Sequence, residues 1–450
     1  MKKYIFSLFL LAIGFTAIAQ QEFGTHFMSN IPQSTFTNPA AFGNYKVTVS
    51  LPSVYAGFYN TAFSPDDIFI KNGNTLELNV GDALDELQDR NNLTLNTSFE
   101  TIGFSIQSKK FRFSFNHGLK VNASLNFPKE MLQFFWGGNA QFIDETINIA
   151  PRVNVMAYQE FGFGVGYKVS ENLTLGTRLK YLVGAGAFYT SNSVIAVHTD
   201  PDFFALSADV DFLIHTAGIP EADLNNGEFF DFDFSNNFFG ENRGFAIDLG
   251  ANLSVGDKIN IQTSILNLGK INWEEQVNNY WSLGSIEFDG FDLQALLDEG
   301  ELDTEELIDS IGQTFEFQSA QSRFTSSLPG QFYLSGTYEV IPNLKVGALF
   351  LAEGFQTTMT RTFGVNAQKD FGRWGAVGAN YVVQEGGVHN FGLNGTVNLG
   401  PVQIFAMSDN LIPLFNPLKT QNTNFRVGVN LVFGKIKDEV LSDELPSDEL

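Results

Sequence analysis

The stretch Asn424-Phe425-Arg426-Val427-Gly428-Val429-Asn430-Leu431-Val432-Phe433 decides the fold. Its apolar residues occupy every second position, while Arg426, Gly428 and Asn430 fall mainly between them. This alternation predicts a β-strand, because successive side chains of a strand point to opposite faces. The length is about the ~10 residues that a tilted strand needs to cross a bilayer. The stretch therefore favours a membrane-spanning β-barrel over a soluble enzyme.

The beginning of the chain has the pattern of a secretion signal. Lys2 and Lys3 precede an apolar run that extends to about Ile18, and Ala17-Ile18-Ala19 forms a cleavage site of the A-x-A type. We expect residues 1–19 to be removed as a signal peptide. No apolar run of about 18 residues follows, so a transmembrane helix is not expected. The two ends together predict export to the outer membrane of a diderm bacterium.

The composition agrees with a lipid-facing surface. The 450 residues include 47 Phe, 12 Tyr and 42 Gly, with no cysteine. Such an excess of Phe is unusual in a soluble core, whereas the wall and interfacial girdles of a membrane barrel accept it. Closure by inter-strand hydrogen bonds would replace disulfides. A large soluble β-sandwich or propeller is the alternative. The formal net charge of −24 excludes nucleic acid as a partner.

Other segments repeat the alternation of the last strand. They lie at 111–116, 161–168, 175–183, 245–253, 331–339 and 391–399. Short turns at 108–110, 169–172, 255–258, 341–343 and 371–374 alternate with longer connections at about 124–152, 216–242, 269–329 and 409–423. Outer-membrane barrels show this phase, with short turns in the periplasm and long loops outside.

We therefore predict an all-β fold, a closed antiparallel transmembrane β-barrel over residues 45–435. About 14 strands are expected, within a range of 14 to 16. Closure is required because an open sheet edge cannot lie in hydrocarbon. The first strand is expected at Tyr45–Leu51 or extending to Tyr59, and the last strand should pair with it.

Four regions fall outside the barrel pattern. Residues 20–44 form an N-terminal extension, and residues 78–91 suggest a short helix. Residues 290–314 have helical spacing of their apolar side chains, which predicts two short amphipathic helices in an external loop. These helices would form a cap over the barrel mouth or, alternatively, dock a partner. Residues 436–450 form an acidic periplasmic tail, either dispensable or a handle for a partner.

Several short stretches resemble an uncharacterised outer-membrane family of the FadL-like superfamily. They are residues 33–40, 49–54, 126–130, 175–184 and 327–336, and the resemblance extends over about 22–434. More distantly, the chain is similar to FadL, the long-chain fatty-acid channel, and to the PorV-type barrel of type IX secretion. The superfamily shares an Asn-Pro-Ala motif, here Asn38, Pro39 and Ala40. The resemblance implies that residues 20–44 act as a plug inside a 14-stranded barrel.

The resemblance implies two functions of different classes. The first is passive uptake of a hydrophobic or amphipathic small molecule. The second is a non-transporting barrel that serves as a subunit or scaffold of an outer-membrane complex for secretion or assembly. Outer-membrane lipid is an expected partner in both cases, and other outer-membrane proteins are expected in the second. By the same resemblance, Phe433 is the signal for the barrel-assembly machinery during insertion.

Sequence patterns for catalysis or cofactors are missing. None of the five histidines has the spacing of a zinc site, and there is no Gly-x-Ser-x-Gly elbow. Gly162, Gly164 and Gly166 lie in a predicted strand, where they would make room for a plug or reduce crowding on the inner face. The loop 228–241 mixes carboxylates with aromatics, which allows a Ca²⁺ site but favours a solvated loop. We expect no enzyme activity, metal or cofactor.

Five charged residues are predicted to face the lumen. They are Arg178, Lys180, Asp248, Glu339 and Arg426. Buried charges require partners or water, because an unpaired charge is costly inside a protein. The five would form an ion-pair network that holds the plug, or they would line a path for a solute.

Overall fold

The computed structural model describes residues 22–72, 75–222, 224, 239–288, 297–298, 301–302, 317–356, 358–384 and 388–436. The predicted signal peptide and most of the acidic tail lie outside these residues. So does most of the loop 228–241. Among the described residues, no helix is long and apolar enough to cross a membrane.

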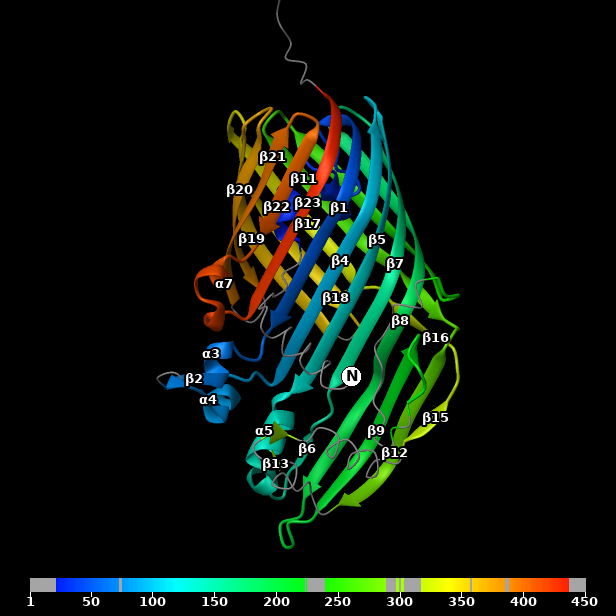
Figure 1. Ribbon diagram of the computed structural model, residues 1–450, viewed down its shortest axis with the longest axis vertical. Coiled ribbons are helices and arrows are strands. Elements are labelled where there is room, and N and C mark those ends of the chain that lie inside the picture. Colours follow the sequence, from blue (N-terminus) through cyan, green and yellow to red (C-terminus); the bar gives the residue numbers. More distant parts are fainter. Residues whose placement is uncertain are drawn as a thin grey trace, which may run out of the picture.

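Fourteen strands close into an antiparallel barrel (Figure 1), which confirms the predicted fold and the lower predicted strand number. In order around the wall they are β1 (Tyr45–Asn60), β4 (Arg90–Gln107), β5 (Phe111–Pro128), β7 (Arg152–Lys168), β8 (Leu173–Thr199), β10 (Arg243–Val255), β11 (Ile259–Trp273), β17 (Gly330–Ile341), β18 (Leu344–Phe355), β19 (Thr358–Asp370), β20 (Gly375–Gln384), β21 (Val388–Leu399), β22 (Val402–Ser408) and β23 (Asn422–Lys435). A short strand, β16 (Phe324–Ser327), pairs with the end of β11 beside β17.

The last strand closes the barrel against the first, as predicted. β23 pairs with β1 from Tyr45 opposite Lys435 to Tyr59 opposite Asn422. The register shifts between Ser50 and Ser53. Pro52 lies in this interval, and proline has no N–H group to donate to the ladder, so an irregularity is expected there. The strand is longer than the ten residues of the predicted segment because pairing continues at both ends.

The two faces of the wall differ in chemistry. Outward side chains such as Phe113, Leu179 and Phe363 are more than half exposed, whereas inward side chains such as Asp248 and Asn430 are buried. An apolar belt of this kind is unfavourable in water and suits hydrocarbon. The wall is therefore that of a transmembrane barrel, with its polar face turned to the lumen.

The long connections lie at one end of the barrel, as predicted, but that end also has two short connections, after β18 and after β20. The turns that follow β4, β7, β10, β17, β19 and β21 lie at the same end as the start of β1 and the end of β23, uppermost in Figure 1. The connections after β1, β5, β8, β11 and β22 lie at the opposite end. We call these the short-turn end and the long-loop end.

A sheet extends the wall beyond the long-loop end, and the sequence did not predict it. The second half of β8 leaves the barrel and pairs with β9 (Leu206–Ala217), and β9 pairs with β12 (Val277–Phe288). Two short strands, β6 (Thr146–Asn148) and β15 (Gln318–Ala320), complete this extension (Figure 1). The predicted connection 269–329 is thus wrong where it includes β12, β15 and β16, and the predicted connection 216–242 starts too early, because β9 extends to Ala217. β15 and β16 have only three and four residues, too few for alternation to reveal them, and β12 interrupts the alternation with Tyr280 next to Trp281.

The helices are short. They are α2 (Phe23–Phe27), η1 (Pro32–Phe36), α3 (Pro65–Ile68), α4 (Val80–Asp85), α5 (Lys129–Gly137), η2 (Asn139–Phe142), α7 (Ile412–Phe415) and η4 (Pro417–Lys419), and a hairpin of β2 (Phe69–Asn72) and β3 (Thr75–Leu78) lies between α3 and α4. Helix α4 confirms the helix predicted at 78–91.

The helical insert predicted at 290–314 is wrong where the structure describes it. There, β13 (Leu297–Asp298) and β14 (Glu301–Leu302) pair as two antiparallel strands. In the sequence, Gly300 falls between them and interrupts the helical pattern, because glycine disfavours a helix interior. The rest of the insert lies outside the described residues.

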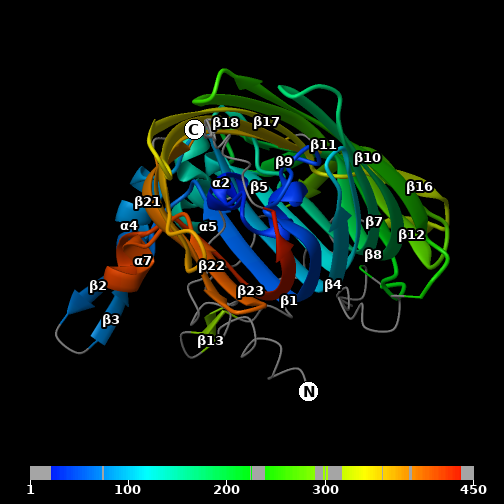
Figure 2. The ribbon, with the colours of Figure 1, turned by 90° about the horizontal axis from the view of Figure 1, so that it is seen from above.

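The N-terminal segment, residues 22–44, lies within the ring of strands (Figure 2). Its helices α2 and η1 are largely buried against the inner face of the wall. Side chains of α2 join Tyr333, Leu349 and Leu351 in an apolar cluster. The lumen therefore contains a folded piece of the same chain.

Candidate functional site

The N-terminal end of α2 is held by one buried carboxylate. Asp409 accepts hydrogen bonds from the backbone N–H groups of Phe23 and Gly24, at 3.0 and 2.8 Å. It also accepts from the side-chain amides of Asn380 at 2.8 Å and Asn424 at 3.1 Å. Four donors around one carboxylate offset the cost of its burial. The segment is thus joined to three separate parts of the barrel at this point.

Two further side chains of the segment bond to the wall. The His26 ring lies parallel to the Tyr333 ring at 5.3 Å, and its Nε2 lies 2.8 Å from Ser335 Oγ. The amides of Gln33 and Asn430 bond to each other in both directions, at 2.9 and 3.1 Å. Gln33 also donates to Glu100 at 3.0 Å. These contacts join polar side chains of the segment to three strands of the wall, β17, β23 and β4.

The Asn38-Pro39-Ala40 motif sits against two glycines of the wall. Asn38 donates to Gln262 at 3.2 Å and accepts from the Ala40 N–H at 2.9 Å, which makes a compact turn. A Cβ atom at Gly176 would overlap the Pro39 carbonyl group, and one at Gly250 would overlap the Asn38 amide. Only glycine permits so close an approach.

The glycine series predicted to make room on the inner face has mixed neighbours. A Cβ at Gly166 would meet the ring of Phe42, which belongs to the N-terminal segment. A Cβ at Gly162 or Gly164 would meet side chains of β5 instead, Asn116 and Ser114 respectively. One of the three therefore accommodates the segment directly, and the other two reduce crowding within the wall.

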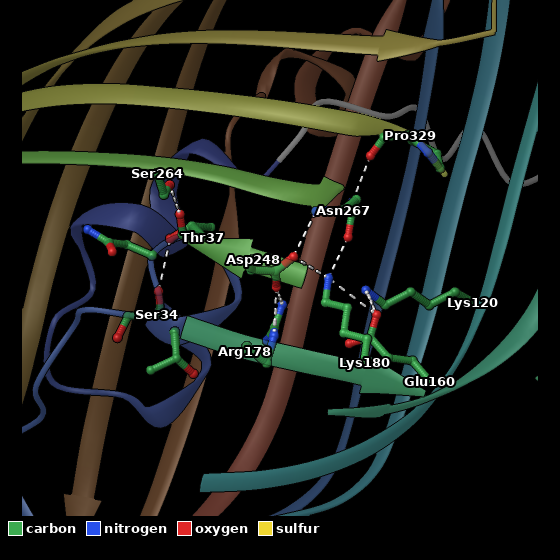
Figure 3. Close-up of polar contacts among 12 residues, drawn as sticks. Ser34, Thr37, Lys120, Glu160, Arg178, Lys180, Asp248, Ser264, Asn267 and Pro329 are labelled. Carbon is green, nitrogen blue, oxygen red and sulfur yellow. Dashed lines mark hydrogen bonds and ion pairs between the residues drawn. The ribbon is translucent and has the colours of Figure 1, made fainter. Parts of the chain in front are cut away.

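Three of the predicted lumen charges meet in one network, shown in Figure 3. Arg178 donates to Asp248 through Nε at 2.8 Å and Nη2 at 2.6 Å. Lys180 Nζ lies 2.9 Å from the other oxygen of Asp248 and 3.6 Å from Glu160, which also pairs with Lys120 at 3.0 Å. β8 and β10 hold the first pair directly opposite each other in the ladder. The buried carboxylates and cations therefore neutralise one another.

Arg426 binds the N-terminal segment instead. Its guanidinium forms an ion pair with Glu22 and donates to Ser53 at 3.3 Å and Ser98 at 3.2 Å. It also lies over the ring of Phe36, 5.6 Å from the centroid. Arg178 lies over the same ring at 5.1 Å. The Phe36 ring of the N-terminal segment thus interacts with both guanidiniums by cation–π attraction.

The two remaining predicted residues lie apart from this cluster. Glu339 accepts a hydrogen bond from the Asn343 N–H at 2.9 Å, in the turn after β17. It therefore caps a turn at the short-turn end. Phe433 points outward near the end of β23, opposite Val47, and is 46% exposed. Its role as an assembly signal remains a prediction.

A cavity lies between the N-terminal segment and the charged network. The space between atoms there amounts to about 870 Å³, a figure that includes open solvent. Its wall includes Phe36, Tyr55, Tyr158, Tyr333, Arg178 and Arg426. Arg178 Nη1 and Arg426 Nε are buried and have no hydrogen-bond partner among the described residues. Donors of this kind require water or a ligand, because leaving them unsatisfied is costly.

A family model described as a family of unknown function, DUF5723, matches residues 39–409. The chain belongs to this family. The match begins at Pro39 of the Asn-Pro-Ala motif and ends at Asp409, the carboxylate that holds α2. This finding confirms the resemblance to an uncharacterised family. No curated protein matches the chain.

Solved outer-membrane channels are similar in shape to this DUF5723 barrel. A deltaS2S3 mutant of TodX, described as a monoaromatic hydrocarbon channel, is 9% identical with a TM-score of 0.47, and the match covers 89% of this chain and 94% of that one. A FadL homologue of Pseudomonas aeruginosa is 11% identical with a TM-score of 0.43, covering 90% and 95%. At such scores the likeness carries no conclusion about a substrate. The architecture rests on the strand pairing of this chain.

Sequence reasoning missed several residues of the DUF5723 site. Glu160 lies beside Phe161 in an alternating strand, so its inward direction was available from the pattern. Glu22 and Asp409 lie outside alternating segments, and only the folded chain brings them to Arg426 and α2. Within the described residues, no group of three or more His, Asp or Glu side chains is placed to hold a metal ion.

Proposed function

We propose that this protein takes up a small amphipathic molecule passively across the outer membrane, and that the lumen cavity is its binding chamber. The observation that carries the proposal is that aromatic residues and arginines with unpartnered guanidinium N–H groups line one cavity. Ligand sites typically combine an apolar lining with a few directed polar groups. A purely hydrophobic molecule would leave these donors unsatisfied, so the amphipathic class is favoured.

The proposal includes a gate. Residues 22–44 cross the lumen and bond to the wall at Asp409, Ser335, Asn430 and Gln262. A solute that leaves the cavity toward the short-turn end must displace this segment. With the short turns in the periplasm, the cavity would face the outside and the segment would close the periplasmic side. In this proposal the signal peptide directs export, and the assembly machinery inserts the barrel into the outer membrane of a diderm bacterium.

A disulfide lock tests the gate, because the chain has no cysteine of its own. A Cβ atom at Gly24 would lie 3.6 Å from Asn394 Cβ, within the range for a disulfide. We would reconstitute Gly24→Cys/Asn394→Cys in vesicles and measure entry of phenylalanine, 3-phenylpropionate and 2-phenylethylamine. Oxidation should reduce entry of the permeant probe by roughly tenfold or more, and reduction should restore it.

The two single cysteine variants are the matched controls, since each contains one of the two substitutions and cannot form the disulfide. The Gly24 side chain would approach Asp409 and Asn380 at 2.9 Å, so both variants at this position share that cost. Entry through the singles should not respond to oxidant. If the locked protein admits the probes as fast as the reduced one, uptake past the N-terminal segment is wrong.

A non-transporting scaffold is the second candidate. The dense hydrogen bonding of the N-terminal segment and the extension of β8, β9 and β12 beyond the barrel favour it. It predicts stable co-purification of partner subunits after mild solubilisation. Deleting the extension should remove those partners and leave the barrel folded. Recovery of the protein alone, under conditions that keep other complexes intact, would count against this function.

A further inference from the structure

Residues that line the lumen cavity carry buried unpartnered acceptors as well as buried unpartnered donors. Glu22 Oε2 and Asn122 Oδ1 are buried and have no hydrogen-bond partner among the described residues, as is true of Arg178 Nη1 and Arg426 Nε. All four residues line the same cavity. A ligand that bears only acceptors would satisfy the guanidiniums and leave the carboxylate side unsatisfied.

The charge balance of the cavity separates the ligand classes further. Four cations line it, namely Lys120, Lys180, Arg178 and Arg426, and they face the carboxylates of Glu22, Glu100, Glu160 and Glu353. Asp248 contacts the network from behind and adds one negative charge. A bare anion would add negative charge to a lumen that already has no cationic excess. A bare cation would in turn leave the guanidinium N–H groups of Arg178 and Arg426 unsatisfied, so a ligand that bears both charges fits better.

The aromatic residues define the third feature of the ligand. Phe36 lies under both guanidiniums, and Tyr55, Tyr158 and Tyr333 line the same space. An apolar group can pack against these rings while its charged groups reach the donors and acceptors. The apolar group must be compact, because the N-terminal segment limits the cavity on one side.

We propose that the cavity binds a small zwitterion of the amino-acid type, with an ammonium group, a carboxylate and an apolar side chain. The ligand carboxylate accepts from Arg178 Nη1 and Arg426 Nε. Its ammonium donates to Glu22 Oε2 and to the Asn122 carbonyl, and its side chain packs on the tyrosines. This inference rests on the proposed function for its biological setting, although binding itself is measurable without transport.

A matched ligand series tests the charge requirement on the purified full-length protein in lipid nanodiscs. Phenylalanine carries both charges, 3-phenylpropionate lacks the ammonium and 2-phenylethylamine lacks the carboxylate. Calorimetry should show phenylalanine binding roughly 10- to 100-fold more tightly than either analogue, the range expected for lost hydrogen bonds to charged groups. Equal or tighter binding of 3-phenylpropionate would overturn the proposal. So would the absence of binding by all three, which would leave water alone in the cavity.

A dipeptide such as Ala-Phe distinguishes a free amino acid from a peptide as the source of the zwitterion. Glu22→Gln should weaken phenylalanine binding by roughly tenfold and should leave the affinity for 3-phenylpropionate unchanged or improved. Glu339→Gln is the matched control, because Glu339 caps a turn outside the cavity. If both variants bind phenylalanine like the parent, Glu22 does not bind the ammonium and the proposal fails.

Transport and binding fail in different ways. Retained phenylalanine binding with no entry into vesicles of any of the three probes would remove the transport function and keep the site. Entry of 3-phenylpropionate in preference to phenylalanine would keep transport and remove the zwitterion site. Both proposals stand only if phenylalanine binds in the cavity and also enters the vesicles.

Discussion

At the scale of single residues, two glycines set how closely the N-terminal segment approaches the wall. Gly176 and Gly250 lie on the neighbouring strands β8 and β10, and both face the Asn-Pro-Ala turn. Any side chain at either position would occupy space that Asn38 or Pro39 already fills. The fit of the segment therefore depends on the absence of side chains at these two wall positions as well as on its hydrogen bonds.

Replacing Gly176 by alanine should loosen the segment. The new Cβ overlaps backbone atoms of Pro39, which cannot move as easily as the end of a side chain, so a loss of about 1–3 kcal/mol in stability is expected. Proteolysis at residues 22–44 should become faster in the folded barrel. Gly336→Ala is the control, because a Cβ there meets nothing within 4 Å. Equal cleavage of both variants would contradict the fit.

Asp248 is the central residue of the buried ion network. Asp248→Asn leaves the Arg178 and Lys180 cations without their shared carboxylate, so a loss of about 3–5 kcal/mol is expected. Urea-induced unfolding from vesicles, followed by tryptophan fluorescence, would measure it. Asp209 is a matched control on the exposed face of β9, where Asp209→Asn weakens only a solvent-accessible hydrogen bond that Ser285 donates to it. That change should cost about 1 kcal/mol or less. Similar losses for both variants would contradict the buried network.

At the scale of elements, β8 is one strand with two environments. Its first half separates lumen from lipid, and its second half continues into the extension, where β9 pairs with it along one edge. In the extension Val210 faces an apolar cluster with Phe134, Phe142 and Val197, while the neighbouring Asp211 faces water. The same period-2 pattern thus serves a bilayer wall and a small soluble core.

Val210→Asp should unfold the extension and spare the barrel. The buried carboxylate has no partner in this cluster, so the local cost is several kcal/mol, of the order of 2–4. Limited proteolysis should cut within residues 190–217, while the heat-modifiable migration of the barrel on gels stays normal. Asp211→Asn should change neither result. Loss of the folded barrel in Val210→Asp would show that the extension and the wall fold as one unit.

At the scale of the whole molecule, the surface divides into an apolar belt and a polar extension. The belt encircles the barrel, whereas the outer face of the extension carries Asp209, Asp211 and Asn192. The border between these surfaces marks where the bilayer ends. Two exposed leucines on either side of the border allow a direct comparison, Leu179 on the barrel wall at 57% exposure and Leu283 on β12 at 78%.

Replacing these two leucines by arginine should affect the stability of the inserted barrel very differently. Leu179→Arg places a charge in the hydrocarbon near the middle of β8's barrel portion, with an expected cost of about 2–4 kcal/mol in the folded, inserted state. Leu283→Arg lies in water and should change stability by less than about 0.5 kcal/mol. Urea titrations in vesicles would measure both. Equal, small effects would place Leu179 outside the membrane.

The sequence by itself determined the class of this protein, its closure and the direction of its strands. Alternation identifies a strand and its two faces from residues two apart, and the spacing of turns orders the strands around a wall. The partner of β23, a range of 14 to 16 strands that contains the observed number, and the inward faces of Arg178, Lys180 and Asp248 follow from such local information. The extension does not follow from it, because alternation does not distinguish a strand face that meets lipid from one that meets a small apolar core.

Only the tertiary structure decided which charges meet and what fills the lumen. Arg178 faces Asp248 because the β8–β10 register sets them opposite each other, and a register between strands 70 residues apart leaves no local signal. Asp409 and Glu22 reach the N-terminal segment and Arg426 from outside any alternating pattern. The partner of a carboxylate depends on distances in space. These distances are set only when the barrel closes around its own N-terminal segment.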